Sequence, residues 1–348
     1  MKNQYLLIIM AVFTLSNCGK KKEPFPYQIP GYAIAPVDSM INETYQVRTL
    51  QLEPDYAGEV TATLMRYDAS DSTRKAVLYV HGYGDYFFHD HVRQWFNEQG
   101  YNFYALDLRK HGRSLLPHQR ASYAKNLEEY FEELTESIRL IKEVDGNDFL
   151  VLNGHSTGGL TTSLYTAKGA AKEQIDALLL NSPFVAVKAS GVEKAMANIF
   201  GGWSKIQPGA SLPIEFEGFY GQSLHQDYAG EWNYSLVWKP IKGYPLYGAW
   251  LNAIKKGHKQ VHKGLGITQP ILVLHSDKSL VPTEMSPALQ QADAVLDVDQ
   301  IQQYSPALGD EVKIVSIKDG MHDILLSKKE VRENAFQEIA AWLAQLPK

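Results

Sequence analysis

Apolar and polar residues alternate along most of the chain in a way that predicts strands and helices in turn. Short apolar runs bounded by glycine, proline or polar residues are typical of strands, whereas apolar residues spaced three and four apart indicate helices. The predicted strands are 59–67, 76–80, 102–106, 149–153, 177–180, 271–275 and 312–317. The predicted helices are 87–99, 127–144, 157–168, 297–308 and 329–346. Because such alternation produces mostly parallel sheets covered on both faces, we predict an α/β fold.

One stretch breaks this alternation. Between Pro183 and about Gly264 no succession of strands and helices is visible, and aromatic residues are frequent. They include Trp203, Phe216, Phe219, Tyr220, Trp232, Tyr234, Trp238, Tyr244 and Trp250. The stretch is too long for an ordinary connection. We therefore predict a cap at 184–264, inserted between two core segments at 45–183 and 265–348, with most of its aromatics in its own core and a few lining a pocket.

The N-terminus has the pattern of an exported protein. Lys2 precedes an apolar run from Tyr5 to Leu15, which has the length of a secretory signal core and is too short to span a bilayer. The run leads to Cys18, the only cysteine of the chain. A chain without further cysteines can leave the cytoplasm without mispaired disulfides.

Residues 15–19 resemble a bacterial lipobox, in which the cysteine is lipid-modified and becomes the mature N-terminus. Asn17 stands where a small residue is usual. We expect a lipoprotein-type signal at 1–18 with lipid attachment at Cys18, a tether at 19–44, and an exported lipoprotein anchored to the cell envelope membrane. A plain signal peptide, or a buried helix with an incidental cysteine, is the alternative.

Composition and charge exclude some classes of protein without identifying a reaction. The chain has 348 residues, of which 45% are hydrophobic and 21% charged, as in ordinary globular proteins. Its formal net charge of -5 gives no reason to expect a nucleic-acid partner. We find no internal repeat, no H-E-x-x-H metal motif and no P-loop, so we expect neither a metal nor an organic cofactor.

The strongest chemical signal is Gly154-His155-Ser156-Thr157-Gly158, which fits the nucleophile-elbow pattern G-x-S-x-G. An apolar strand precedes it at 149–153 and a helical pattern follows. A sharp turn between strand and helix lifts the serine above the sheet, and glycines beside it remove Cβ atoms that would clash. We predict that Ser156 is a nucleophile.

A serine hydroxyl needs a base to take its proton. His322 lies after the last predicted strand and before the final helix, which fits the Ser…acid…His order of α/β-hydrolases. The oxyanion of the tetrahedral intermediate needs backbone N–H donors. Thr157 follows the nucleophile and supplies one, and Tyr83, in the glycine-rich turn 81–84 after an early strand, is our candidate for the other.

Four segments together resemble the monoacylglycerol lipase and lysophospholipase branch of the α/β-hydrolases, which overlaps with the serine aminopeptidase-like hydrolases. They are His81–Gly84, Asp107–Ser114, Gly154–Gly159 and Gly320–Asp323. The resemblance covers most of 60–340 and implies the α/β-hydrolase fold with an inserted cap. It also implies that Asp107–Ser114 is a structural loop near the site, in which Lys110 replaces the usual glycine.

The triad acid is left open by the residues, because the Gly-x-x-Asp of the family is altered here. Asp277 lies closest behind the strand 271–275. Asp293, however, opens an Asp-x-Val segment before a helix, at the spacing from His322 that is usual for α/β-hydrolases. We favour Asp293 over Asp277, with Asp297 third; an aspartate that is not the acid is expected on the surface or at a helix cap.

The residues predict a serine hydrolase that cleaves carboxylic esters. An aromatic-rich cap favours an apolar acyl chain, and a lipid anchor would favour a lysophospholipid or a monoglyceride. An aminopeptidase-like peptidase or amidase is the first alternative; it would need an anionic residue in the cap to hold a substrate amine, such as Glu215, Glu217 or Glu231. A non-catalytic binding protein on the same fold is the second. The sequence does not indicate an oligomeric state.

Overall fold

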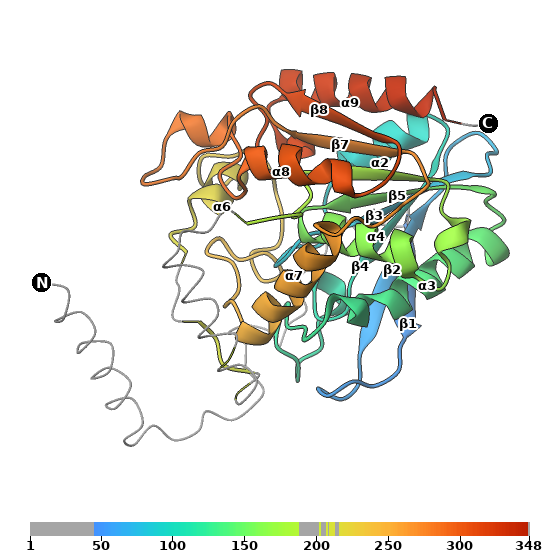
Figure 1. Cartoon of the computed structure of the whole chain (residues 1–348), viewed down its shortest axis with the longest axis horizontal. Coiled ribbons are helices and arrows are strands. Elements are labelled where there is room, and N and C mark those ends of the chain that lie inside the picture. The colour runs from blue at the N-terminus through green and yellow to red at the C-terminus, as the bar shows by residue number, and fades with distance from the viewer. Residues whose placement is uncertain (1–44, 188–201, 203–206, 208, 213–215, 347–348) are drawn as a thin grey trace, which may run out of the picture.

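The structure, a computed structural model, describes residues 45–187, 202, 207, 209–212 and 216–346 (Figure 1). Within these residues the strands form one eight-stranded sheet in the order β1-β2-β4-β3-β5-β6-β7-β8. Their bounds are β1 Gln46–Gln51, β2 Thr61–Tyr67, β3 Lys75–Val80, β4 Asn102–Asp107, β5 Phe149–His155, β6 Ala177–Asn181, β7 Ile271–Ser276 and β8 Val312–Ile317. β2 runs antiparallel to both of its neighbours, and every other pair in the sheet is parallel.

Helices cover both faces of this sheet, as the alternating pattern predicted. They are α2 Asp90–Glu98, α3 Phe131–Arg139, α4 Thr157–Lys168, α6 Phe219–Leu224, α7 Gly248–Val261, α8 Val298–Tyr304 and α9 Lys329–Leu343. α2 and α9 lie over one face, and α3, α4 and α7 lie over the other (Figure 1).

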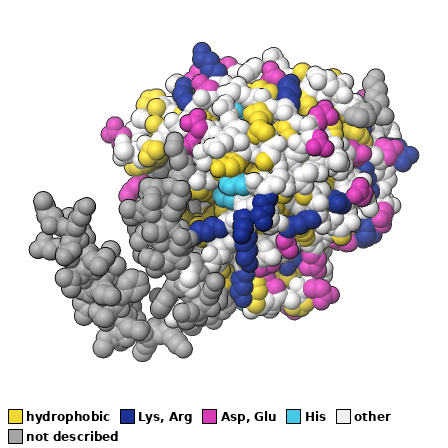
Figure 2. All heavy atoms as spheres, viewed as in Figure 1, with side chains coloured by type: hydrophobic (Ala, Val, Ile, Leu, Met, Phe, Trp, Pro, Cys, Tyr) yellow, Lys and Arg dark blue, Asp and Glu magenta, His cyan; other side chains and the backbone are white. Residues whose placement is uncertain are grey.

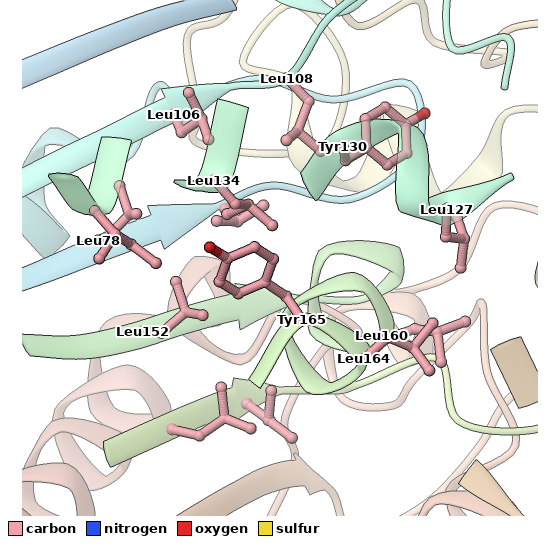
Figure 3. Packing of buried hydrophobic residues seen from close by; sticks show 14 of the residues in the cluster. Leu78, Leu106, Leu108, Leu127, Tyr130, Leu134, Leu152, Leu160, Leu164 and Tyr165 are labelled. Carbon is pink, nitrogen blue, oxygen red and sulfur yellow. The ribbon is translucent and has the colours of Figure 1, made fainter. Parts of the chain in front are cut away.

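The two largest apolar clusters lie on the two faces of the sheet, because successive strand residues point to opposite sides. Along β3, Leu78 belongs to the cluster under α3 and α4, whereas Val77 and Tyr79 belong to the cluster under α2 and α9. In the first cluster, Leu134 of α3 and Tyr165 of α4 lie among the leucines of the sheet (Figure 3). All five side chains are at most 1% exposed. Burial on both faces explains why the central strands are continuously apolar.

Two predicted helices differ from those observed, and one observed strand was not predicted. The helix predicted at 127–144 begins as a 3-10 turn, where Asn126 and Glu129 form a capping box, continues as α3 and ends as a π-helical turn at 140–144. The helix predicted from Phe87 begins only at Asp90, and in the loop before it the Phe87 N–H donates to Asp107 Oδ1. β1 was not predicted at all. It is an edge strand in which Leu50 is the only fully buried residue, so its apolar signal is weak.

Among the described residues, α6 and α7 lie in the stretch predicted as a cap. α7 packs directly on α4: a Cβ added at Gly257 would lie 3.1 Å from side-chain atoms of both Leu127 and Leu160. Its apolar residues therefore share the core under α3 and α4. The boundaries 184 and 264 stay a prediction, since much of the stretch lies outside the described residues.

The predicted signal at 1–18, its Cys18 and the tether at 19–44 also lie outside the described residues. Among the helices that the structure does describe, none has the length and apolar character needed to cross a bilayer.

Candidate active site

Ser156 occupies the sharp turn between β5 and α4. Its backbone has φ 54° and ψ -119°, a conformation that residues with a Cβ rarely adopt. The turn is tightly enclosed: a Cβ added at Gly154 would lie 2.4 Å from Thr162 Oγ1, and one at Gly158 would lie 2.3 Å from the carbonyl oxygen of His81. Glycine is required at both places, which is why the G-x-S-x-G string could be interpreted from sequence.

His322 lies in the loop after β8, and its ring reaches the elbow. The His322 Nε2 atom is 3.1 Å from Ser156 Oγ, and Nδ1 is 3.0 Å from Asp293 Oδ2. An ionised carboxylate only accepts hydrogen bonds, so Nδ1 carries the proton of the neutral ring. Nε2 is then left to accept the proton of Ser156. The ring is 3% exposed and held between the two partners.

Asp293 is the carboxylate that the structure places against His322. It is fully buried, and its second oxygen, Oδ1, accepts the N–H groups of Val295 at 2.8 Å and Leu296 at 2.7 Å. Ser279 and Asp293 form a parallel β-bridge, and the Asp293 N–H donates to the Lys278 carbonyl, so the chain between them loops out and returns beside the segment that follows β7.

The other two candidate acids lie elsewhere. Asp277 Oδ1 accepts the N–H of Asp319 at 2.8 Å, and its side chain is 32% exposed. Asp297 caps α8 by accepting the N–H of Asp299 at 3.0 Å. Each therefore has a local structural role, in a loop contact and at a helix end.

The turn His81–Gly84 lies directly against the elbow. A Cβ added at Gly82 would be 3.1 Å from the Cβ of Ser156. Tyr83 and Thr157 line the same small cavity of about 10 Å³. In the part of the chain that the structure describes, the N–H of neither residue donates a hydrogen bond to a protein group. Both amides are therefore available to an oxyanion above Ser156, and α4 adds the positive end of its dipole.

A buried polar cluster, which the sequence interpretation missed, lies behind the loop that carries His322. Asp323 accepts a hydrogen bond from Asn181 Nδ2 at 2.7 Å and is 2.9 Å from His89 Nε2. Burial alone would raise the pKa of Asp323, but the neighbouring His155, His89 and Asn181 lower it well below its usual range. In the sequence, Asp323 is visible only as an acidic residue next to His322. No local pattern distinguishes such a buried residue from an acidic residue on the surface.

The described part of the predicted cap contacts this loop through α6. The Tyr220 hydroxyl accepts the N–H of Asp323 at 3.1 Å, and its ring meets the His322 ring edge-on at 5.7 Å between centroids. A second contact joins Lys239 Nζ to Asp85 Oδ1 at 2.6 Å, with Asp85 only 3% exposed. The described part of the predicted cap is thus tied both to the loop that carries His322 and to Asp85, just after the turn at 81–84.

The loop at 107–114 supports the same turn. Asp107, which is fully buried, accepts the N–H of Phe87 and pairs with Arg113 at 2.8 Å. Lys110 has φ 64°, the left-handed conformation in which glycine is usual. Its amino group pairs with Asp55 and also donates to the Tyr56 hydroxyl at 3.1 Å. The departure at Lys110 thus keeps the glycine-like backbone and adds a buried ion pair.

Of the residues considered as anchors for a substrate amine, two lie on the surface and one is not described. Glu217 is exposed, Glu231 pairs with Arg332 on the surface, and Glu215 lies outside the described residues. Among the described residues no group of three or more His, Cys, Asp or Glu side chains could hold a metal ion.

Comparison with known proteins places the chain among hydrolases. Residues 71–329 match the family described as serine aminopeptidase, S33. A monoacylglycerol lipase of Mycolicibacterium smegmatis (strain ATCC 700084 / mc(2)155) is 28% identical over 278 residues, which cover 76% of this chain and 92% of that protein.

Solved structures share the fold at low identity. A soluble variant of monoglyceride lipase from Saccharomyces cerevisiae, in complex with a substrate analog, matches with a TM-score of 0.65 and 15% identity, covering 93% of this chain and 100% of that chain. A thermostable carboxyl esterase from Bacillus coagulans matches with a TM-score of 0.61 and 14% identity, covering 88% and 99%. These likenesses establish the α/β-hydrolase fold.

Proposed function

The chain belongs to the serine aminopeptidase, S33, family of α/β-hydrolases, and we propose that it cleaves carboxylic esters through an acyl-enzyme. The observation that carries the proposal is the contiguous line of Ser156, His322 and Asp293, with contacts of 3.1 Å and 3.0 Å. Nucleophile, base and orienting acid are the three groups that acyl transfer requires.

In the proposed mechanism Ser156 Oγ attacks the acyl carbonyl carbon while His322 Nε2 takes its proton. The N–H groups of Tyr83 and Thr157 hold the oxygen that becomes negative. His322 then protonates the departing alcohol oxygen, and the acyl group stays on Ser156. Water attacks the carbonyl carbon of the acyl-enzyme and gives a proton to the same nitrogen. The bond from that carbon to Ser156 Oγ then breaks, His322 returns the proton to Oγ, and the carboxylic acid is released. Asp293 keeps the ring oriented and stabilises its charged form.

We propose monoacylglycerols or lysophospholipids as the substrate class. The 28% identity to a monoacylglycerol lipase supports this, as do the fold shared with a monoglyceride lipase and the aromatic density of 184–264. Sites for such substrates are mostly apolar with a few orienting polar groups.

A panel of substrates tests both the proposed ester hydrolysis and the proposed substrate class. The full chain is assayed with p-nitrophenyl esters of graded acyl length, monooleoylglycerol, lysophosphatidylcholine and aminoacyl-p-nitroanilides, with Ser156→Ala as the blank. We expect ester turnover that rises with acyl length and disappears in the variant. Hydrolysis of anilides but not esters would establish the amidase alternative, and no turnover of any compound would favour a binding protein.

We also propose that the chain is an exported lipoprotein held at a membrane through Cys18. The apolar run from Tyr5 to Leu15 and the single cysteine after it support this. Expression of Cys18→Ser in a bacterial host tests it: the variant should move from the membrane fraction to the soluble fraction. Unchanged fractionation would contradict the anchor without affecting the proposed chemistry.

A further inference from the structure

A long stretch of the chain contains no acidic residue. Between Glu231 and Asp277 there are six lysines and no Asp, Glu or Arg. The lysines are Lys239, Lys242, Lys255, Lys256, Lys259 and Lys263. The chain as a whole has a formal net charge of -5, whereas this stretch is positively charged. Mixed signs are usual on a solvated helix, and their absence calls for a physical reason.

The structure gathers part of this charge on one side of α7. Lys256 and Lys259 are three residues apart and Lys263 follows four later, just past the helix end, so their side chains project from one side. All three are exposed. The opposite side carries the buried Ile254 and Val261, which pack into the core with α4. α7 is thus an amphipathic helix with an outer face of lysines.

Lys256, Lys259 and Lys263, which we call the lysine face, form no ion pair with any described residue. On the flank of α7, Lys168 donates to Gln260 at 2.7 Å, and its own charge is already paired with Glu128. Figure 2 shows Lys and Arg side chains gathered in the middle of the molecular face on which Figure 1 draws α7.

The same helix begins beside the candidate active site. The Trp250 ring, in the first turn of α7, lies 4.3 Å from the Tyr83 ring between centroids. The Tyr83 hydroxyl donates to the carbonyl of Pro245, just before the helix. The helix α7 therefore connects the turn His81–Gly84, which we call the oxyanion turn, with the lysine face.

We propose that the lysine face of α7 is a docking surface for an anionic lipid bilayer. Lysines are compact point charges that respond to the diffuse field of anionic headgroups, whereas bidentate recognition of single phosphates favours arginine, which this stretch lacks. The choice of a bilayer over another polyanion rests on the proposed function, because the proposed substrates reside in membranes. Docking through α7 holds the oxyanion turn close to the substrate lipids in that bilayer.

Vesicle binding tests the proposal without any substrate. The full chain carries Cys18→Ser throughout, so that N-terminal acylation cannot contribute. Sedimentation is measured with two kinds of vesicle. One is phosphatidylcholine alone, and the other contains about 30 mol% phosphatidylglycerol, whose anionic headgroups give the surface a negative potential. We expect binding to the anionic vesicles that falls steeply between low and high salt, as screening shortens the reach of the charges.

The test variant is Lys256→Gln, Lys259→Gln, Lys263→Gln. Each lysine near an anionic surface contributes about fivefold in partitioning, so the triple change should weaken binding about 100-fold. The matched control is Lys75→Gln, Lys318→Gln, Lys329→Gln, which removes the same charge from exposed lysines elsewhere on the chain. It should bind within about twofold of the parent, since long-range net charge is screened.

Equal loss in both triple variants would mean a net-charge effect and overturn the proposal, as would unchanged binding of the test variant. Retention on heparin without binding to anionic vesicles would assign the face to another polyanion and also overturn it. Hydrolysis of a water-soluble p-nitrophenyl ester, measured in parallel, should be the same in all three proteins. That measurement separates the two proposals: vesicle binding without turnover contradicts only the proposed chemistry.

Discussion

At the scale of single residues, the site depends on a few positions where ordinary backbone or charge rules are broken. Ser156 has a positive φ, Lys110 has a left-handed backbone where glycine is usual, and Asp293 is a carboxylate without exposure. Each exception is compensated locally: Ser156 by the glycines of its turn, Lys110 by Asp55, and Asp293 by two backbone N–H groups and His322.

Replacing the buried carboxylate should separate the two candidate acids. In Asp293→Asn the amide can present its NH₂ group to Nδ1 and favour the wrong tautomer, so we expect kcat to fall about 10³–10⁴-fold. Asp277→Asn, which alters a contact to the Asp319 N–H, should stay within a few-fold of the parent. Steady-state kinetics on a p-nitrophenyl ester measures both, and a severe effect of the Asp277 change alone would show the assignment to be wrong.

Backbone strain at the elbow should be measurable in two inactive variants. Ser156→Ala keeps a Cβ at φ 54°, whereas Ser156→Gly removes it. Strain of about 1–3 kcal/mol is relieved, and the extra flexibility of glycine in the unfolded chain offsets part of that gain. We expect the glycine variant to be about 1 kcal/mol more stable than the alanine variant by urea unfolding. An alanine variant about 0.5–1 kcal/mol more stable than the glycine variant, the cost of the extra flexibility of glycine alone, would show that the elbow is unstrained.

At the scale of elements, the site forms where the ends of β3, β5, β7 and β8 meet the start of α4. Parallel strands place their carboxyl ends at one edge of the sheet, and the loops that follow them carry the reacting groups there. The closeness of α4 to β3 is what brings the turn at 81–84 against Ser156. A Cβ added at Gly158 would also lie 2.5 Å from the Val80 carbonyl, so backbone, not side chain, sets this distance.

Gly158→Ala should therefore damage packing and activity together. The new methyl group would collide with the backbone of β3, and we expect a loss of about 3 kcal/mol or more in unfolding free energy together with loss of esterase activity. Gly100→Ala is the control: its φ is 74°, but nothing lies within 4 Å of an added Cβ. It should cost only about 1 kcal/mol and leave turnover unchanged. Similar costs for the two changes would contradict a steric role for Gly158.

At the scale of the whole molecule, charge is distributed unevenly between interior and surface. Histidines are buried in the core, while lysines gather on α7. Burial lowers the pKa of His111 to about 3 and that of His91, His155 and His258 to about 4. These four rings are therefore neutral in the folded protein at pH values where the unfolded chain would already bind protons.

Stability should fall as the solution becomes acidic. Between pH 6.5, where histidine titrates in the unfolded chain, and about pH 4, the unfolded state binds more protons than the folded state, so each ring weakens folding by up to about 1.4 kcal/mol per pH unit. This stability is fully present above pH 6.5 and is lost as pH falls toward 4. Urea midpoints at pH 7.5, 6.5, 5.5 and 4.5 measure it, and a flat profile over that range would contradict the buried neutral histidines.

The sequence by itself determined the features that local physics encodes. Apolar runs or alternation between turns predicted seven of the strands; the runs are most nearly continuous in the central strands, which are buried on both faces. The elbow around Ser156 was visible because its strained turn demands glycine at Gly154 and Gly158. The edge strand β1 and the π-helical end of the segment at 127–144 were not visible, since few buried contacts or a local hydrogen-bond shift define them.

Only the tertiary structure decided which distant groups meet. The spacing to His322 favoured Asp293 over Asp277, but only the fold shows the contact: the segment of Asp293 lies beside Ser279 in a parallel bridge, and its carboxylate reaches His322 Nδ1. Asp323 joins a buried cluster because three segments fold around it. The lysines of α7 were plain in the sequence, but their common outer face follows from which side of the helix packs on α4. Non-local contacts of this kind depend on the whole chain at once, so local patterns do not determine them.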